Sequence, residues 1–246
     1  MFLILILCSV SALIFLAHYN FWRPRCNSFW PRILMYHNTS NEPLSGMNIS
    51  SQKLEKQIYY LINKGYTFLK ISELTHFNKK AKHVVLTFDD GFVGNYTYLF
   101  DLLKRYNVSA TIYLTPKIKN IVSLSSNHIK EMQESGLVEF GAHTMTHVNL
   151  EKVDDKIAQK EIVQSKKAVE KLTGFTCFSF AYPYGRYNDH HIEMVKNAGF
   201  TTAVTTKKAI LAFDNANAYT LPRLSINGCV NMIQFYLILS RGRYKL

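Results

Sequence analysis

Short apolar blocks alternate with longer amphipathic blocks along most of this 246-residue chain. The apolar blocks are rich in β-branched and aromatic residues and predict strands at 32–37, 66–69, 83–86, 110–114, 138–141, 178–182, 201–205 and 221–226. Apolar residues at helical spacing predict helices from 51 to a stop at Gly65, briefly from 72, and at about 95–105, 127–135, 155–172, 189–197 and 230–240. Strands that alternate with helices predict a parallel sheet, and seven or eight such strands favour closure into a barrel.

The first residues form a separate apolar segment. Residues 2–17 are an almost unbroken apolar run, and Tyr19, Phe21 and Trp22 follow it like an interfacial aromatic belt. The run is marginal in length for a bilayer span, longer than many signal-peptide cores, and lacks a convincing small-x-small cleavage motif. We therefore expect an uncleaved membrane anchor at 1–22, a linker at 23–31 and one globular domain at 32–246.

Composition allows one large core and does not identify a partner. The chain is 48% hydrophobic, and its 29 basic residues against 17 acidic residues give a formal net charge of +12. Such a charge suits an anionic membrane, nucleic acid or a polyanionic polymer. The lysines are scattered between elements, as at Lys64, Lys70 and Lys82, and no nucleic-acid motif accompanies them. We therefore expect a solvated basic surface and no nucleic-acid partner.

The four cysteines, Cys8, Cys26, Cys177 and Cys229, are far apart and form no Cys-x-x-Cys pair. This spacing argues against a zinc ribbon and against a disulfide scaffold. Cys177 and Cys229 could pair in an exported domain, but we expect buried free thiols.

Two adjacent carboxylates follow the third predicted strand, in the sequence Thr-Phe-Asp-Asp-Gly at 87–91. Barrels and open α/β sheets place their chemistry at the carboxyl ends of strands, which makes Asp89 and Asp90 candidate active-site residues. A structural interpretation stays open, in which Gly91 adopts a left-handed turn and the aspartates cap the next helix.

Two histidines, His143 and His147, follow the strand at 138–141. Imidazoles four residues apart can reach one metal ion from a single helical turn or a tight loop, although such a pair also occurs by chance. The position after a strand allows both histidines to converge with one aspartate of the Asp89/Asp90 pair. The other aspartate would then lie near the metal-bound water, where a general base is needed.

A third strand end carries Tyr182, Pro183, Tyr184 and Gly185, with Tyr187 close behind. The tyrosines could line a sugar-binding groove, and the turn could direct a backbone N–H at a developing oxyanion. The structural alternative is a proline-bounded loop with tyrosines packed beneath it.

Thr-Phe-Asp-Asp-Gly, His-Thr-x-x-His and Tyr-Pro-Tyr-Gly, in this order, resemble the motifs of the polysaccharide deacetylases of carbohydrate esterase family four, over roughly residues 30–228. The Leu-Met-Tyr-His strand end and Leu221–Leu224 further resemble the branch that contains poly-β-1,6-N-acetylglucosamine deacetylases. The resemblance implies a distorted (β/α) barrel of about seven parallel strands and metal-dependent removal of N-acetyl groups. It implies Asp89 as general base and Asp90, His143 and His147 as ligands of a divalent metal, for which we expect Zn²⁺.

The chain departs from the broader family at two places. Many members have an arginine two residues before the proline of the third motif, where this chain has Ala181, and a late Leu-x-His, where this chain has Leu-Pro-Arg. We expect Arg223 to replace the arginine by pairing with Asp89. We expect His37, at the end of the first strand, to replace the histidine as general acid.

The resemblance, together with these motifs, implies an enzyme that removes N-acetyl groups from a poly-β-1,6-N-acetylglucosamine-like polysaccharide by attack of a metal-bound water. The Tyr184 N–H would hold the oxyanion, and the substrate contacts would come from Tyr182, Tyr184, Tyr187 and Phe92. Chitin-like oligomers or peptidoglycan are alternative substrates. Two other classes also stay open, a non-haem iron oxygenase and a non-catalytic carbohydrate-binding relative.

The expected location is a membrane-anchored protein with an extracytoplasmic catalytic domain. Arg23, Arg25 and Arg32 follow the apolar run, and the positive-inside rule would instead keep the domain cytoplasmic. That conflict, and the oligomeric state, stay open.

Overall fold

The computed structural model of the chain describes residues 23–41 and 46–243, together with Ser9. The expected anchor at 1–22 lies outside the described residues, apart from Ser9. Within the described ranges, no helix combines the length and the apolar character needed to cross a bilayer.

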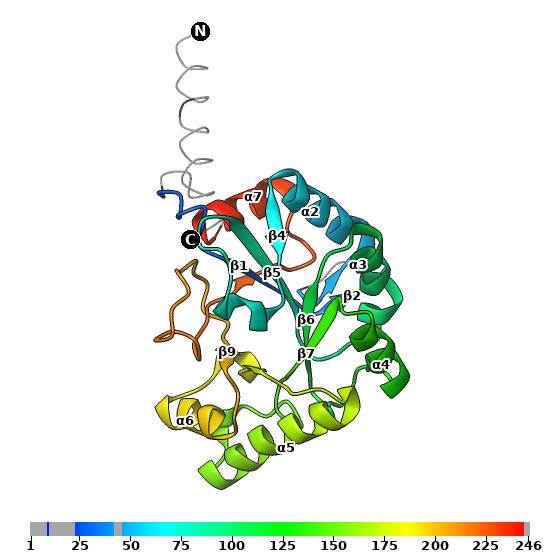
Figure 1. Cartoon of the computed structure of the whole chain (residues 1–246), viewed down its shortest axis with the longest axis vertical. Coiled ribbons are helices and arrows are strands. Elements are labelled where there is room, and N and C mark those ends of the chain that lie inside the picture. Colours follow the sequence, from blue (N-terminus) through cyan, green and yellow to red (C-terminus); the bar gives the residue numbers. More distant parts are fainter. Residues whose placement is uncertain (1–8, 10–22, 42–45, 244–246) are drawn as a thin grey trace.

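A single all-parallel sheet forms the centre of the molecule (Figure 1). Seven of its eight strands follow one another in the order β10-β1-β5-β6-β7-β8-β9, and β4 pairs with β5 beside this path. The bounds are β1 Arg32–Tyr36, β4 Tyr66–Phe68, β5 Lys82–Phe88, β6 Ala110–Leu114, β7 Val138–Ala142, β8 Ser179–Ala181, β9 Thr202–Val204 and β10 Leu224–Ser225. The prediction of an α/β fold with about seven parallel strands is confirmed at this level.

The segment before β10 joins the two ends of this curled sheet. Leu221 forms a parallel bridge with Val204 of β9, while Leu224 pairs with Leu34 of β1. The sheet is also irregular at β5. There β4 pairs with the first half of β5, and β6 pairs with the last two residues of β5. The sheet therefore curls into a half-barrel, which is consistent with the distorted barrel that the sequence predicts.

Alternation along the strands divides the core in two. In β1 and β5, Leu34 and Leu86 face the helices, while Ile33 and Val85 belong to the cluster inside the barrel. Because both faces of the sheet are covered, the strand sequences are continuous apolar runs.

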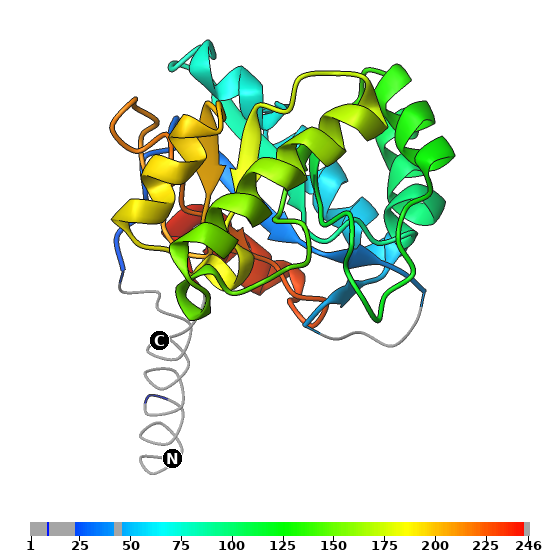
Figure 2. The same ribbon diagram turned by 90° about the horizontal axis from the view of Figure 1, so that it is seen from below.

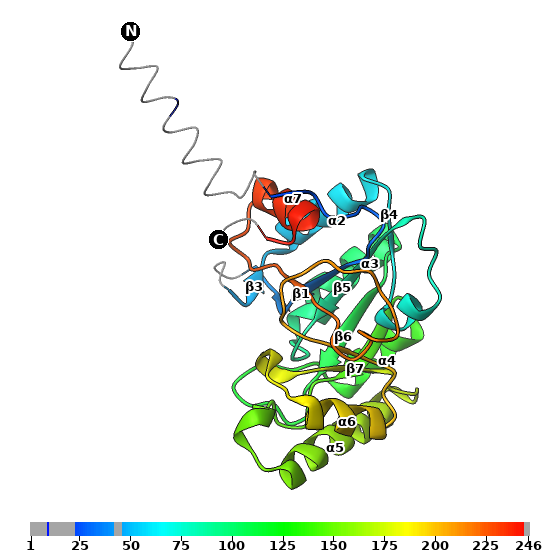
Figure 3. The same ribbon diagram turned by 90° about the vertical axis from the view of Figure 1, so that its left-hand side faces the viewer.

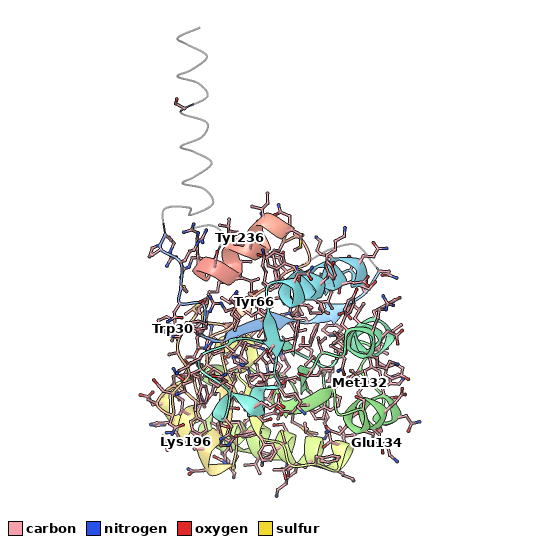
Figure 4. The ribbon with its side chains drawn as sticks, turned by 45° about the horizontal axis from the view of Figure 1, so that its top comes forward. Trp30, Tyr66, Met132, Glu134, Lys196 and Tyr236 are labelled. Carbon is pink, nitrogen blue, oxygen red and sulfur yellow. The ribbon has the colours of Figure 1, made fainter. Side chains whose placement is uncertain are left out.

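Helices pack around the outside of the sheet (Figures 1 and 2). Their bounds are α2 Ser51–Asn63, α3 Phe100–Tyr106, α4 Ser126–Glu134, α5 Asp155–Thr173, α6 Asp189–Asn197 and α7 Met232–Arg241. Each helix has one buried face. On α4, for example, Met132 is fully buried whereas the Glu134 side chain is 62% exposed (Figure 4). Seen from the side, α2 and α7 lie at one end of the sheet and α5 and α6 at the other (Figure 3).

Three short features differ from the expected pattern. The predicted helix at 95–105 begins as a π-helical turn, Asn95–Leu99, and the helix near 72 is a 3₁₀ turn, Ile71–Thr75. A small parallel sheet of β2 (Asn38–Thr39) and β3 (Asn48–Ile49) was not predicted, because two-residue strands have no periodicity to read.

The segment between the expected anchor and the domain packs against α7. The Cys26 N–H donates to the Ser240 carbonyl at 2.8 Å, and Arg32 Nε donates to the Leu239 carbonyl at 2.9 Å. Arg32 is only 2% exposed. It is therefore a structural residue of the fold.

The cysteines that the structure describes are all free thiols. Cys177 is buried and Cys229 is exposed, so the alternative in which they pair is wrong, and the expected burial holds for Cys177 only. Cys8 lies outside the described residues.

Candidate active site

Asp90, His143 and His147 come together at the carboxyl ends of β5 and β7. One ligand atom from each lies within 4.8 Å of the others. Asp90 Oδ1 is 3.8 Å from His143 Nε2 and 3.5 Å from His147 Nε2. Two imidazole nitrogens and one carboxylate oxygen leave room for water and substrate, which is the donor set of catalytic zinc sites.

Left-handed backbone at both strand ends directs these side chains. Asp90 has φ 72° and Gly91 has φ 79°, while Thr144 and His147 have φ 58° and 60°. Such conformations are costly for residues other than glycine and cluster at functional sites. The turn at Asp90 allows the two adjacent aspartates to point in different directions, Asp90 to the histidines and Asp89 into the barrel.

In both histidines, Nε2 faces Asp90 and the other ring nitrogen, Nδ1, has a protein partner. His143 Nδ1 lies 2.7 Å from the Ala181 carbonyl oxygen, which can only accept, so Nδ1 carries the proton and Nε2 presents a lone pair toward Asp90. His147 Nδ1 lies 3.1 Å from the Tyr184 hydroxyl. Asp90 Oδ1 is buried without a hydrogen-bond partner among the described residues. A buried carboxylate oxygen without a hydrogen-bond partner, facing two imidazole nitrogens, fits a divalent cation.

Asp89 forms a bidentate ion pair with Arg223. Arg223 Nη1 and Nη2 donate to the two Asp89 carboxylate oxygens at 2.7 and 2.8 Å. Arg223 also donates from Nε to the Thr205 carbonyl at 2.9 Å and from Nη1 to the Thr87 hydroxyl at 3.1 Å. The pairing that the sequence predicts is therefore present, and both partners are almost completely buried.

The two carboxylates have opposite electrostatic environments. Burial alone would raise the pKa of Asp89, but the charges of Arg223 and the nearby histidines hold that pKa well below its usual range. For Asp90, burial and then the Asp89 charge raise the pKa to about 7, with Arg223 acting in the opposite direction. Asp89 is thus an anion near neutral pH, whereas burial and the neighbouring Asp89 charge disfavour the ionised form of Asp90.

His37 lies at the same mouth, directly after β1. Tyr36 and Phe88 are paired in register, and the Asp89 N–H donates to the Tyr36 carbonyl at 3.0 Å, so the segments after β1 and β5 run side by side. The His37 carbonyl accepts from Asn95 Nδ2 at 3.1 Å. Burial lowers the pKa of the His37 imidazole, and the Asp89 charge partly offsets this effect. The acid role of His37 stays a prediction.

The tyrosine-rich loop divides into exposed and buried residues. Tyr184 has φ 59° and is 58% exposed, with its ring 4.6 Å from the His147 ring. Tyr182 is completely buried, and its ring stacks on Tyr187 at 4.4 Å. The expectation that Tyr182 contacts the substrate is therefore wrong, because the chain after β8 places the Tyr182 side chain in the core. Tyr187 is half-buried, as is Phe92 after β5.

One residue that supports the histidine loop had no sequence signal. Glu161, on α5, accepts from the Met145 and Thr146 N–H groups at 2.8 and 2.9 Å and from the Thr146 hydroxyl at 3.0 Å. These bonds fix the loop between His143 and His147. On the sequence, Glu161 is one charged residue among many in an amphipathic helix.

The chain is similar to known proteins over the part that carries most of these residues. A sequence profile described as polysaccharide deacetylase matches residues 76–203. The chain is 30% identical over 201 residues to a putative polysaccharide deacetylase from Bacillus subtilis (strain 168), covering 79% of this chain and 71% of that protein. It is 27% identical over 226 residues to poly-β-1,6-N-acetyl-D-glucosamine N-deacetylase from Staphylococcus aureus (strain MRSA252), covering 85% and 77%. A crystal structure of a polysaccharide deacetylase from Bacillus cereus aligns with a TM-score of 0.77 at 28% identity, covering 85% and 69%.

Proposed function

Because this chain belongs to the polysaccharide deacetylase family and is a deacetylase hydrolase, we propose that it removes N-acetyl groups from a poly-β-1,6-N-acetylglucosamine-like polymer in a metal-dependent reaction. One observation carries the proposal: the Asp90, His143 and His147 cluster lies at the same strand ends as a second, separately paired aspartate. The similarity to the staphylococcal deacetylase supports the choice of polymer. Chitin-like oligomers and peptidoglycan are the alternative substrates.

Asp90, His143 and His147 would hold the metal, and their two nitrogens and one oxygen suit Zn²⁺. A divalent cation in this position supplies Lewis acidity, which lowers the pKa of water and polarises a carbonyl group. The Ala181 carbonyl and the Tyr184 hydroxyl orient the two imidazoles. A non-haem iron oxygenase uses a similar ligand set, but that reaction does not explain the ion pair between Asp89 and Arg223.

Asp89 takes the proton from the attacking water. Its ionised state near neutral pH follows from the Arg223 pair, and the two bonds to Arg223 fix the carboxylate plane. The low pKa makes Asp89 a weak base, but one that is unprotonated at any ordinary working pH. Holding the base at one orientation contributes to the rate because proton transfer depends on geometry first.

The tetrahedral adduct collapses to acetate and a free amine. The Tyr184 N–H, in its left-handed turn, stabilises the oxyanion, and His37 gives the proton that the departing nitrogen requires. An amine is a poor leaving group until it is protonated, so an acid at this mouth is necessary. The position of His37 beside Asp89 supports this assignment.

Acetate release from a panel of N-acetylated glycans tests the function. The full chain should release acetate from β-1,6-linked N-acetylglucosamine oligomers faster than from β-1,4-linked oligomers or peptidoglycan. Asp89→Asn should keep its metal but lose about 10²- to 10⁴-fold in turnover, the usual contribution of a general base. Binding without acetate release from any glycan would favour a non-catalytic carbohydrate-binding protein.

The anchored, extracytoplasmic location is also part of the proposal. It is supported by the apolar run at 2–17 and the aromatic residues that follow it. A topology reporter fused after Leu246 tests it, since activity on the cytoplasmic side would contradict the proposed orientation.

A further inference from the structure

A pocket of about 360 Å³ opens at the amino ends of the strands, at the opposite end of the sheet from the candidate active site. Three of the residues that line it, Arg32, Tyr66 and Lys82, are the first residues of β1, β4 and β5. Arg32 pairs in register with Val84 of β5, and Tyr66 pairs with Lys82, so the sheet itself brings the three residues together. The pocket is therefore separate from the residues that we propose for catalysis.

The rest of the wall comes from α2, α7 and the segment before β1. Tyr60 lies in α2, Lys64 directly follows α2, and Tyr236 lies in α7. Arg25 belongs to the segment that is hydrogen-bonded to α7. Tyr236 on α7 and Tyr66 on β4 lie at the same end of the molecule (Figure 4). The pocket is thus built where four distant segments of the chain meet.

The pocket carries positive charge without an acidic partner. Arg25, Arg32, Lys64 and Lys82 line it, and no aspartate or glutamate is among its described lining residues. None of these four cations forms an ion pair with a residue that the structure describes. Four uncompensated cations around one cavity create a positive potential, which attracts an anion.

Arg32 holds the most rigid donor group of the pocket. Its side chain is almost completely buried. Nε donates to the Leu239 carbonyl at 2.9 Å, and Nη1 donates to the carbonyls of Asn27, at 2.7 Å, and Trp30. Within the described ranges Nη2 has no hydrogen-bond partner, so its two N–H groups stay available to a ligand. A fixed guanidinium with donors to spare is suited to a phosphate oxygen.

Tyrosine rings accompany the other three cations. Each cation lies at a cation–π distance from the centre of one ring, and the pairs are Arg25 with Tyr236 at 6.0 Å, Lys64 with Tyr60 at 5.7 Å and Lys82 with Tyr66 at 5.9 Å. Such contacts restrict long side chains that would otherwise move freely in solvent. The cations therefore stay near the cavity, where together they suit a compact, multiply charged oxyanion.

The position of the pocket indicates a phosphate at a membrane surface. Arg25 is eight residues beyond the end of the apolar run at 2–17, and eight residues of extended chain reach at most roughly 28 Å. Exposed apolar side chains flank the pocket: Phe29, in the segment before β1, is 45% exposed, and Ile233, one helical turn before Tyr236, is 56% exposed. Cations beside exposed apolar side chains are typical of protein surfaces that lie on anionic lipids.

We propose that this pocket binds the phosphate group of an anionic lipid headgroup and thereby orients the domain on the membrane. Because the pocket lies at the amino ends of the strands, a membrane on this side leaves the active-site mouth, at the carboxyl ends, facing away from the bilayer. The mouth is then open to a polymer outside the membrane. The inference goes beyond the proposed function, adds to the proposed anchored location, and does not depend on acetate release.

Lipid titrations of the full chain in micelles of a neutral detergent test the site. Short-chain phosphatidylglycerol should raise the melting temperature by about 2–4 °C, because a ligand of the folded state stabilises it, and short-chain phosphatidylcholine should not. Inorganic phosphate, which lacks the apolar contacts, should bind about tenfold more weakly than phosphatidylglycerol. Equal responses to the two lipids would overturn the proposal, and inorganic phosphate that binds as tightly as phosphatidylglycerol would overturn the lipid assignment.

Charge-removing variants locate the binding site. Lys64→Gln and Arg25→Gln each remove one exposed cation and should weaken phosphatidylglycerol binding about fivefold. Lys196→Gln is the matched control, since Lys196 Nζ also lies over a tyrosine ring, 5.4 Å from the centre of Tyr219. Lys196 is on α6, at the other end of the molecule from α2 and α7 (Figure 3). Unchanged affinity in both pocket variants, or an equal loss in the control, would contradict the assignment.

Acetate release from soluble oligomers separates this inference from the proposed function. In the same detergent, Lys64→Gln and Arg25→Gln should keep kcat/KM within about twofold of the native value, because distant sites without shared partners act independently. A native chain that binds phosphatidylglycerol through the pocket but releases no acetate contradicts only the proposed function. An active chain that binds neither phosphatidylglycerol nor inorganic phosphate contradicts only the proposed lipid site.

Discussion

Arg223 and Asp89 are 134 residues apart in sequence and form two hydrogen bonds, at 2.7 and 2.8 Å, in the interior of the barrel. Asp89 is 3% exposed and Arg223 is not exposed. The guanidinium therefore stabilises a carboxylate that has almost no contact with water, and it orients that carboxylate at the mouth of the barrel.

Removal of the arginine should destabilise the fold. Arg223→Leu leaves Asp89 buried and unpaired, and breaking a buried ion pair in this way costs about 3–5 kcal/mol. Urea unfolding measures the loss. The control is Arg105→Leu, which removes a surface pair with Glu55 at 2.7 Å and should cost at most about 1 kcal/mol. Similar losses in the two variants would mean that the Arg223 pair contributes no more than a surface bridge.

The three proposed ligands should be individually necessary. Asp90→Ala, His143→Ala and His147→Ala each remove one donor from a set of three, so we expect bound metal and acetate release to be lost together. Elemental analysis of the purified proteins gives the metal content. His190→Ala is the control, because His190 is an exposed histidine paired with Asp155 at 3.4 Å. Full metal occupancy in the three variants would rule out this ligand set.

Glu161 should act on the metal through the loop that it holds. Glu161→Ala removes the acceptor for the Met145 and Thr146 N–H groups, and loss of such outer contacts typically weakens metal binding about 10- to 100-fold. Competition with a chelator measures the affinity. Glu151→Ala, in the nearby Leu150–Lys152 turn, should leave it unchanged. A normal metal affinity in Glu161→Ala would show that the histidine loop keeps its conformation without this support.

His37 should matter most when the leaving group needs a proton. We expect His37→Ala to lose much more activity on N-acetylglucosamine oligomers than on an activated aryl acetate ester, whose leaving group departs unprotonated. The ratio of the two losses is the readout. Equal losses would assign His37 a binding or structural role.

Glu139 should make stability depend on pH. Burial raises the pKa of this carboxyl above its ordinary value of 4.5, against the opposing effects of the Ser72 hydroxyl and Lys70. The folded protein therefore binds the proton more tightly than the unfolded chain, and stability falls as pH rises from 4.5 through the folded pKa. Glu139→Gln should be more stable than the native protein at neutral pH, and this difference should disappear in acid. Urea unfolding at several pH values measures it, and a difference that is constant with pH would contradict the shift.

The positions of individual helices and strands could be predicted well from the sequence. The helix expected at 189–197 is Asp189–Asn197, and the strand expected at 110–114 is Ala110–Leu114. Such elements depend on the spacing of apolar residues and on caps close in sequence, such as Asn188, which accepts from the His191 N–H at 3.1 Å. The motifs at 87–91 and 143–147 could also be identified from the sequence as candidate site residues, because parallel strands carry their functional residues at their carboxyl ends.

The contacts between distant segments depended on the tertiary structure. Tyr182 and Tyr184 are two residues apart in one motif, yet one is buried and the other is 58% exposed, because the left-handed backbone at Tyr184 turns the chain there. Glu161 supports the histidine loop only because α5 packs beside β7. The sequence by itself determined which segments become strands and helices and which strand ends carry chemistry. The curl of the sheet decided which of those ends meet, because long-range contacts depend on the packing of the whole barrel and not on local spacing.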